Sequence, residues 1–291
     1  MNVTPDLETP RPADGAGFSD AVTVAFGDPR ANVYGLARAG LAEGAASELA
    51  LLFHGPQIVA GVAESVPAGE RPWETQRVVS RVAEPLSRWE AAFDAGAEGG
   101  FALELEALGA PAVLDPGSDA GEAGGMIGYE HLCRVTGTVR VGGEEIAVDC
   151  LGQRDHLWGS PDWRRMSLAR RVDAWLGDDL GITLTSIRPA RVREHDTERR
   201  TAVVLEGRPG EPHPIADPRL STTYDGERRH RAAGFELWPP EPDAYPRRGA
   251  GTAVCGTSLN LGRLRMDCAF FHWRMEGRAG VGRYDVLRHA A

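Results

Sequence analysis

The chain has 291 residues, of which 42% are hydrophobic and 25% are charged, and its formal net charge is −10. This composition is ordinary for a soluble globular protein, and the length allows one large β domain or two smaller ones. The negative charge argues against a nucleic-acid partner, which needs a basic face. All 32 basic residues are arginine, which excludes chemistry that depends on a Schiff-base lysine.

Signals for targeting, membrane insertion and metal binding are missing from the sequence. Residues 1–20 are acidic and proline-rich and lack the basic and apolar regions of a signal peptide. No apolar run approaches the roughly 18 residues of a membrane span. The cysteines form no CxxC pair, and neither HxH nor HExxH occurs. We therefore expect a cytoplasmic protein with no transmembrane segment, no disulfide framework, no metal and no other cofactor.

Short segments that are typical of β-strands fill the first part of the chain. They are Ala21–Phe26, Ala31–Ala39, Ser47–Phe53, Ile58–Val62, Thr75–Ala83, Arg88–Phe93 and Phe101–Ala107. Residues 48–64 predict a hairpin that turns at residues 54–56, and no segment carries a clear helical pattern. Residues 114–126 are rich in Gly and Asp, which predicts a loop between two halves of the chain.

A β-hairpin after this loop is the clearest element. Arg134–Val141 and Glu144–Leu151 flank Gly142 and Gly143, a two-residue turn that is typical of tight hairpins. Apolar and polar residues alternate here, as in a half-buried sheet. The later predicted strands are Arg165–Leu176, Gly181–Pro189, Thr201–Gly207, Arg229–Trp238, Thr252–Leu261, Leu264–Arg274 and Gly282–Leu287. We expect the turn-rich stretches between them, 208–228 and 239–251, to be loops.

The number of strands sets the fold class. A single barrel of about eight to ten strands takes only roughly 130–180 residues, so about fifteen strands indicate two β units. We therefore expect an all-β fold with two consecutive antiparallel β-barrel or β-sandwich domains. The expected domains are residues 1–125 and 126–291, with the boundary placed between residues 110 and 160.

Residues 152–163, GQRDHLWGSPDW, are the most informative stretch of the chain. Arg154, Asp155 and His156 stand side by side at the end of a strand that faces a core. Burying such groups costs several kcal/mol unless they are paired and hydrogen-bonded. On a regular strand Arg154 and His156 share one face, and Asp155 points to the other. The cluster is therefore either a satisfied structural network or the reactive part of a pocket.

The catalytic interpretation makes Asp155 a general acid. An apolar pocket raises the pKa of a carboxyl group, and His156 would orient Asp155 or relay its proton. Trp158 and Trp163 would offer aromatic faces to a lipophilic substrate or to a developing carbocation.

The structural interpretation is equally open at this point. In it, Arg154 pairs with a carboxylate such as Asp162 and forms a strut between the two β units, while the tryptophans belong to the core. Three further aromatic residues are candidates for the wall of a pocket. Tyr129 belongs to a cluster at a loop end that is either functional or a solvated edge, and Phe271 and Trp273 supply apolar bulk on a late strand.

The motif resembles the G-x-R-D-H-x-W-G-x-x-D-W signature of carotenoid 1,2-hydratases and hydroxyneurosporene-synthase-like proteins, a two-domain lipocalin-like superfamily. The matching residues are Gly152, Arg154, Asp155, His156, Trp158, Gly159, Asp162 and Trp163. The closing sequence GVGRYDVLRH also resembles the end of such proteins. The resemblance implies two lipocalin-like, or calycin, domains with a lipophilic pocket near their junction. It also implies cofactor-independent hydration or cyclisation in which Asp155 and His156, next to Arg154, handle the proton.

Three functions follow from this resemblance and from the motif. The first is an acid-catalysed hydratase or cyclase for a terpenoid, polyene or polyketide. The second is a pericyclase, which needs only shape and a few hydrogen-bond donors. The third is a carrier that binds a lipophilic small molecule without converting it. Fold resemblance alone does not choose among them, and the sequence leaves the oligomeric state open.

Overall fold

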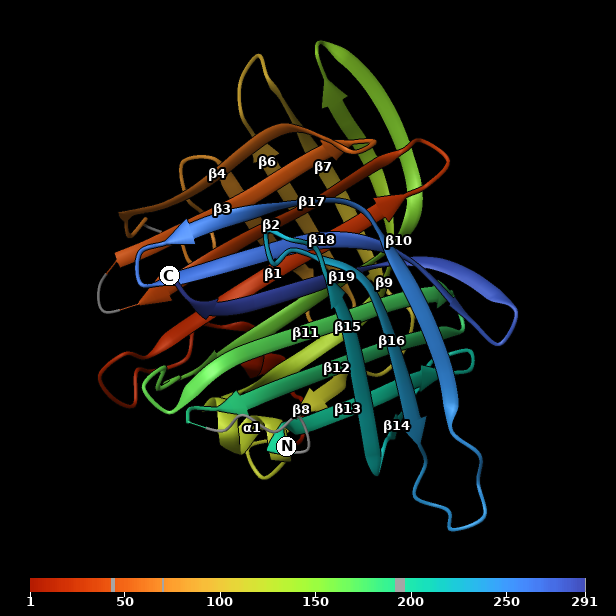
Figure 1. The fold of residues 1–291 in the computed structure, drawn as a ribbon. Helices are drawn as coiled ribbons and strands as arrows, with labels where there is room; N and C mark the ends of the chain where they lie inside the picture. The colour runs from red at the N-terminus through yellow and green to blue at the C-terminus, as the bar shows by residue number, and fades with distance from the viewer. Residues whose placement is uncertain (43–44, 70, 192–196, 291) are drawn as a thin grey trace.

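The computed structural model describes residues 1–42, 45–69, 71–191 and 197–290 (Figure 1). Within these ranges the chain forms nineteen strands, one short α-helix and one 3₁₀ helix. The predicted all-β fold with two β units is confirmed. Neither helix in the described ranges is long and apolar enough to cross a membrane.

The first β unit is a curled antiparallel sheet in the order β4-β3-β2-β1-β10-β9-β7-β6-β5, with β8 beside β9. Its strands are β1 (Ser19–Asp28), β2 (Val33–Ala42), β3 (Ala45–His54), β4 (Gln57–Pro67), β5 (Val78–Glu84), β6 (Arg88–Asp94), β7 (Gly99–Ala107), β8 (Ala112–Leu114), β9 (Met126–Val141) and β10 (Glu144–Gly159). Edge strand β5 contacts β2 and β3, so the sheet curls toward closure. The 3₁₀ helix η1 (Pro5–Glu8) precedes it.

The second β unit is a nine-stranded sheet in the order β14-β13-β12-β11-β19-β18-β17-β16-β15. Its strands are β11 (Met166–Gly177), β12 (Leu180–Pro189), β13 (Arg199–Glu206), β14 (Glu211–Pro214), β15 (Asp217–Tyr224), β16 (His230–Trp238), β17 (Arg247–Leu261), β18 (Leu264–Met275) and β19 (Arg278–His289). In both units the first strand pairs with the last, β1 with β10 and β11 with β19. The two units therefore repeat one topology.

The chain passes from one sheet to the other between Gly159 and Met166. Residues 126–159, which we expected in the second domain, form β9 and β10 of the first sheet. These strands pair along their whole length, from Met126 opposite Gly159 to Val141 opposite Glu144. The assignment of strands to sheets therefore places the division between the two β units at residues 160–165.

Three stretches that we predicted to be loops contain regular structure. Residues 114–126 include helix α1 (Asp119–Gly124), because the Ser118 hydroxyl accepts a hydrogen bond from the backbone N–H of Gly121 and caps it. Residues 208–228 include β14 and β15, both at an edge of the second sheet. An edge position leaves the N–H side of a strand without an obligatory partner, so it tolerates proline. Strand β17 likewise begins at Arg247, inside the predicted loop 239–251.

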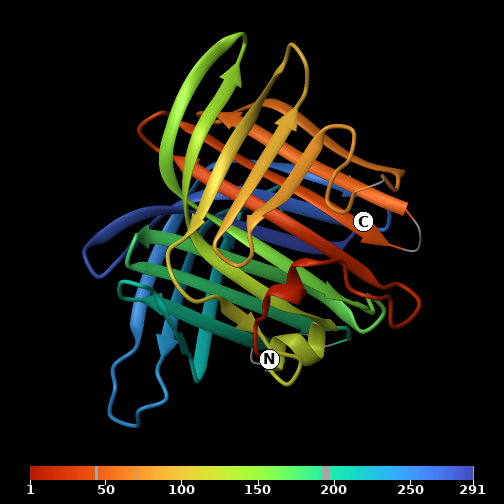
Figure 2. The same ribbon diagram turned by 180° about the vertical axis from the view of Figure 1, so that it is seen from behind.

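The two sheets pack against each other through their outer faces (Figures 1 and 2). Because side chains alternate across a strand, neighbouring residues serve different cores. Phe271 belongs to the interior of the second unit, whereas Phe270 packs between the sheets with Tyr34 and Trp175. The interior of the first unit holds a separate cluster around Phe26. Each β unit thus has its own core, and a third core joins them.

Candidate functional site

Residues 152–159 of the motif form the last part of β10, which is regular there. Residues 153–159 pair in unbroken register with β1 on one side and with β9 on the other. Arg154 and His156 point into the first unit, and Gln153 and Asp155 point between the sheets. This alternation is the predicted one, and it divides the motif between two buried polar networks.

Arg154 binds the N-terminal segment. Its Nη2 donates to Glu8 Oε2 at 2.5 Å, and both side chains are buried. Glu8 Oε1 accepts a hydrogen bond from the Trp89 indole at 3.0 Å, and the Arg154 guanidinium lies 4.9 Å from the centre of the Trp89 ring. Asp162, the partner that we had considered, instead pairs with Arg164 at the surface. Arg154 therefore holds η1 on the first unit and does not link the two units.

His156 holds the same segment from a second side. Its Nδ1 lies 2.8 Å from the carbonyl oxygen of Leu7, and its Nε2 lies 2.7 Å from Asp20 Oδ1. A carbonyl oxygen only accepts, so Nδ1 carries a hydrogen, and the His156–Asp20 contact holds one further proton. Tyr129 and Trp158 pack around the ring, with centroids 5.8 and 5.0 Å away. His156 is 0% exposed, so both ring nitrogens bind groups of the protein and neither contacts solvent.

His131 lies in the same interior, between aromatic rings. Its ring centroid is 5.1 Å from that of Trp89 and 5.9 Å from that of Tyr129. Burial, together with the positive charge of Arg154, lowers the pKa of His131 to about 3. The imidazole is therefore neutral at physiological pH, next to a permanently charged guanidinium.

The other face of the motif belongs to a buried ionic cluster between the sheets. We call it the interface cluster; it consists of Glu130, Asp155, Arg171, Asp173, Arg283 and Asp285. Arg171 pairs with Glu130 and lies 3.3 Å from Asp155 and 3.5 Å from Asp173. Arg283 lies 2.9 Å from Asp285 and 3.7 Å from Asp155. Strands β9, β10, β11 and β19 thus contribute charges to one buried network.

The charges of the interface cluster do not balance. Four carboxyl groups surround two guanidiniums, and Arg38, which interacts with Asp155 electrostatically, adds a third positive charge nearby. Buried charges that lack a counter-charge are costly, so at least one carboxyl group keeps its proton. Burial, with Asp173 beside it, raises the pKa of Glu130 to about 8 against the opposing effect of Arg171. Glu130 is therefore a largely neutral acid at pH 7.

Glu130 also lines a cavity. The cavity has a volume of about 20 Å³ and lies between β8, β9 and β10 of the first unit and β11 to β13 of the second. Thr183 Oγ1 lies on its wall and donates to Glu130 Oε2 at 3.4 Å. A space of this size holds one water molecule. Among the described residues, neither carboxylate oxygen of Asp173 has a hydrogen-bond partner, which is unusual for buried polar atoms outside functional sites.

The structure brings only part of the predicted site together. Tyr129 and Trp158 lie with His156 inside the first unit. Trp163 lies in the connection between the sheets, 6.0 Å from the His289 ring. Phe271 and Trp273 stack on each other at 5.3 Å in the core of the second unit. These last three aromatic residues therefore do not share a pocket with Asp155.

The sequence reasoning missed most of the interface cluster. Its signal is present in the strands RRVDAW and GRYDVL, where a basic and an acidic residue stand two positions apart within an apolar stretch. Arg171 and Asp173 are one such pair, and Arg283 and Asp285 are the other. Because side chains of a strand alternate, each pair lies on one face, and here that face is the interface.

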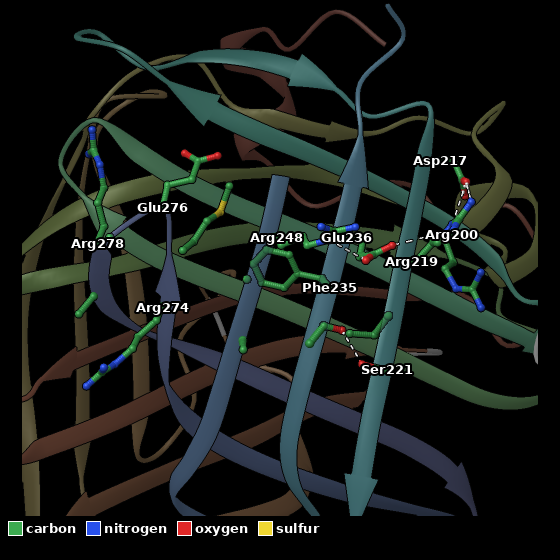
Figure 3. A pocket seen from close by; sticks show the side chains of 17 residues that line it. Arg200, Asp217, Arg219, Ser221, Phe235, Glu236, Arg248, Arg274, Glu276 and Arg278 are labelled. Carbon is green, nitrogen blue, oxygen red and sulfur yellow. Dashed lines mark hydrogen bonds and ion pairs between the residues drawn. The ribbon is translucent and has the colours of Figure 1, made fainter. Parts of the chain in front are cut away.

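A larger hollow lies in the second unit. It is an open groove of about 1260 Å³ along β15 to β18, and four of its charged side chains pair with one another (Figure 3). Arg219 lies 2.8 Å from Asp217, and Arg248 lies 2.8 Å from Glu236. The described residues contain no group of three or more His, Cys, Asp or Glu that could hold a metal ion.

These features define a class: a lipocalin-like protein of two β units that join through a buried ionic cluster. The chain belongs to the family described as a domain of unknown function, DUF7064, which matches residues 4–290. No curated protein matches the chain.

Three solved structures share the fold along almost the whole chain. A putative AttH from Nitrosomonas europaea has 13% sequence identity and a TM-score of 0.72, covering 95% of this chain and 94% of that one. CghA, solved with Sch210972, has 12% identity and a TM-score of 0.66, with coverages of 94% and 89%. Kievitone hydratase from Nectria haematococca has 11% identity and a TM-score of 0.61, with coverages of 94% and 90%. At these identities the likeness establishes the fold alone.

Proposed function

We propose that this protein is a cofactor-independent hydratase or cyclase that protonates a lipophilic substrate at the junction of its two β units. The observation that carries the proposal is Glu130, a buried carboxyl group whose pKa is raised to about 8 at the edge of a cavity. A carboxylic acid that keeps its proton at neutral pH is suited to general acid catalysis. The kievitone hydratase with the same fold is compatible with this class of reaction.

In the proposed reaction Glu130 gives its proton to one carbon of a carbon–carbon double bond, and the positive charge develops on the other carbon. In hydration, a water molecule beside Glu130 adds to that carbon and returns a proton to the Glu130 carboxylate. In cyclisation, a second double bond of the substrate attacks the cation, and loss of a proton to the carboxylate restores the acid. Arg171, which pairs with Glu130, stabilises the carboxylate between the two steps.

Asp155 has a different role here from the one that the motif predicts. It lies 3.3 Å from Arg171 and competes with Glu130 for that guanidinium. Asp155 therefore helps to keep the proton on Glu130 and is a positioning residue, while His156 and Arg154 hold the N-terminal segment.

The substrate needs more room than the cavity of about 20 Å³ offers. Strand β8 covers the cavity, has three residues, and pairs with β9 alone among the described strands. Because β8 is short and hydrogen-bonds to a single neighbouring strand, it opens at lower cost than long strands that pair on both sides. We propose that the substrate enters beneath β8.

The test compares wild type with Glu130→Gln, which keeps the shape of the side chain and removes the transferable proton. The probes are kievitone and lycopene, incubated in H₂¹⁸O or in D₂O and analysed by mass spectrometry. Hydration adds one labelled water, and cyclisation gives an isomer that carries deuterium. We expect Glu130→Gln to lower the rate by about 10²–10⁴-fold, the usual contribution of a general acid. Glu104→Gln, at an exposed glutamate of β7, is the control.

An unchanged rate in a folded Glu130→Gln variant would remove Glu130 as the acid. A wild-type protein that binds a probe, as measured by tryptophan fluorescence, and never converts it would favour the second candidate, a carrier of lipophilic molecules. The open groove of the second unit, with a volume of about 1260 Å³, is the observation that favours a carrier.

A further inference from the structure

A second pocket, separate from the interface cluster, carries an excess of positive charge. Its volume is about 650 Å³, and its lining includes Arg170, Arg188, Arg228 and Arg288. None of its described lining residues is Asp or Glu. We call it the arginine pocket. Arg170 and Arg288 point to the inside of the second unit, since they contact Glu198 and Asp267, and the interface cluster lies on the opposite face of the same strands.

Among the described residues, two carboxylates lie behind the arginine pocket, fewer than the guanidiniums that they contact. Glu198 is buried and pairs with three guanidiniums, and Asp267 is buried and pairs with two. The five are those of Arg170, Arg188, Arg200, Arg265 and Arg288. The excess of positive charge around this pocket contrasts with the formal net charge of the chain, which is −10.

Arg228 adds a sixth positive charge at the rim. It lies in the turn between β15 and β16, its side chain is exposed, and no ion pair or side-chain hydrogen bond joins it to another described residue. Its carbonyl oxygen accepts a hydrogen bond from Arg288 Nη2 at 2.8 Å. Burial lowers the pKa of Arg288, and the charge of Arg228 lowers it further, while Asp267 opposes both. An anion in the pocket would relieve this repulsion.

We propose that the arginine pocket binds an organic anion, a carboxylate or a phosphate monoester that carries an apolar group. Guanidinium groups present paired N–H donors that match both headgroups. Leu168, Leu220 and Tyr224 also line the pocket and give the apolar group a surface. The volume lies within the range of about 300–1,000 Å³ that is usual for small-molecule sites.

The test is calorimetric titration of wild type at low salt with octanoate, octyl phosphate and octanol. We expect both anions to bind, and octanol, which has the same chain without the charge, to bind at least about tenfold more weakly. The stronger of the two anions identifies the headgroup. Arg228→Gln is expected to weaken both anions by about tenfold or more, equivalent to about 1.4 kcal/mol. Its exposed position should leave folding intact, as checked by circular dichroism.

Arg274→Gln is the matched control, because Arg274 is an exposed arginine of the same unit that lines the open groove instead (Figure 3). If both variants weaken anion binding equally, the effect comes from long-range charge, and the proposed site is wrong. Octanol binding as tightly as octanoate, or no binding of either anion, would overturn it as well. Glu130→Gln should bind octanoate like wild type, so this result is independent of the proposed catalysis.

Discussion

Asp155 and Glu130 both contact Arg171, so each carboxyl group affects the other. Asp155→Asn removes a negative charge near Glu130 and leaves more of the positive potential of Arg171 to stabilise ionised Glu130. We therefore expect the variant to lower the pKa of Glu130. The rate depends on protonated Glu130, so its loss at high pH should begin at a lower pH in the variant. A pH–rate profile measures this shift, and Asp149→Asn, at an exposed carboxylate of β10, should not cause it.

The opposite outcome is equally clear. If Asp155→Asn abolishes turnover at every pH while the protein stays folded, Asp155 is the acid that the motif resemblance implies. If the variant stays active and its pH–rate profile is shifted, Glu130 is the acid that donates the proton.

Arg154 and Glu8 form a buried ion pair. Replacing one of the two residues should lower the stability of the protein strongly, because the other charge is left buried without its partner. Arg154→Met leaves Glu8 as a buried carboxylate without its guanidinium, which costs about 3–5 kcal/mol of unfolding free energy. Combining it with Glu8→Met replaces both charges by apolar groups, so the double variant should lose less stability than the sum of the single variants. Urea unfolding of the four proteins measures this, and additive losses would exclude a direct pair.

The strand alternation that sequence alone provides predicted the faces of Arg154 and Asp155 correctly. It did not provide their partners. Glu8 lies 146 positions from Arg154 in the chain, and Arg171 and Arg283 come from the other sheet. Charge pairs of this kind form only when distant segments pack, and no local pattern encodes them.

The β9–β10 hairpin positions the motif. Its glycines differ in whether the surrounding atoms leave room for a Cβ atom. A Cβ at Gly128 would lie 2.1 Å from the carbonyl oxygen of His156, at a φ of +153°. Gly128→Ala must therefore push β9 away from β10 at the motif, and we expect a loss of about 2–4 kcal/mol, as for other severe steric changes. At the turn, Gly142 has φ +56° and no atom within 4 Å of its Cβ position. Gly142→Asn creates the Asn-Gly turn that hairpins favour, so its stability should change little.

Thermal unfolding of the two variants compares them directly. Equal stability of Gly128→Ala and wild type would mean that β9 and β10 do not approach closely at the motif. Glycine also explains why the hairpin is longer than predicted. Gly152 directly follows the predicted end of the strand at Leu151, and a Cβ there would meet the carbonyl oxygen of Ala25 at 2.3 Å, so this glycine allows close strand contact. In sequence, such a glycine is hard to distinguish from one that ends a strand.

At the scale of the whole molecule, composition and strand count predicted two β units, but not where the first one ends. The Gly-rich stretch before Met126 has the usual signs of a linker, yet it contains α1 and leads into two strands of the first sheet. The connection between the two sheets, residues 160–165, is short and carries less turn signal. The middle of each sheet depends on the pairing of its first and last strands, which are far apart in the sequence.

Each β unit contains a buried histidine whose pKa is lowered, so the stability of both units depends on pH. Burial lowers the pKa of His131 to about 3 and that of His230 to about 4. An unfolded histidine takes up a proton near pH 6.5. As the pH falls from about 6.5 toward these folded values, only the unfolded state binds the protons, so each histidine costs up to about 1.4 kcal/mol of stability per pH unit.

Glu130 works in the opposite direction. Its pKa is raised to about 8 when folded, so the folded state holds a proton that the unfolded state releases above about pH 4.5. Its contribution to stability is therefore complete below about pH 4.5 and is lost as the pH rises through 8. Between pH 6.5 and 5 the two histidines oppose Glu130 and also Asp285, whose pKa is likewise raised by burial. In His131→Gln/His230→Gln the effect of these carboxyl groups is no longer opposed by the two histidines, so its melting temperature should rise relative to that of wild type on acidification. Calorimetry at pH 6.5, 5.75 and 5 compares the two proteins, and an equal change in both would mean that neither histidine is buried in its neutral form.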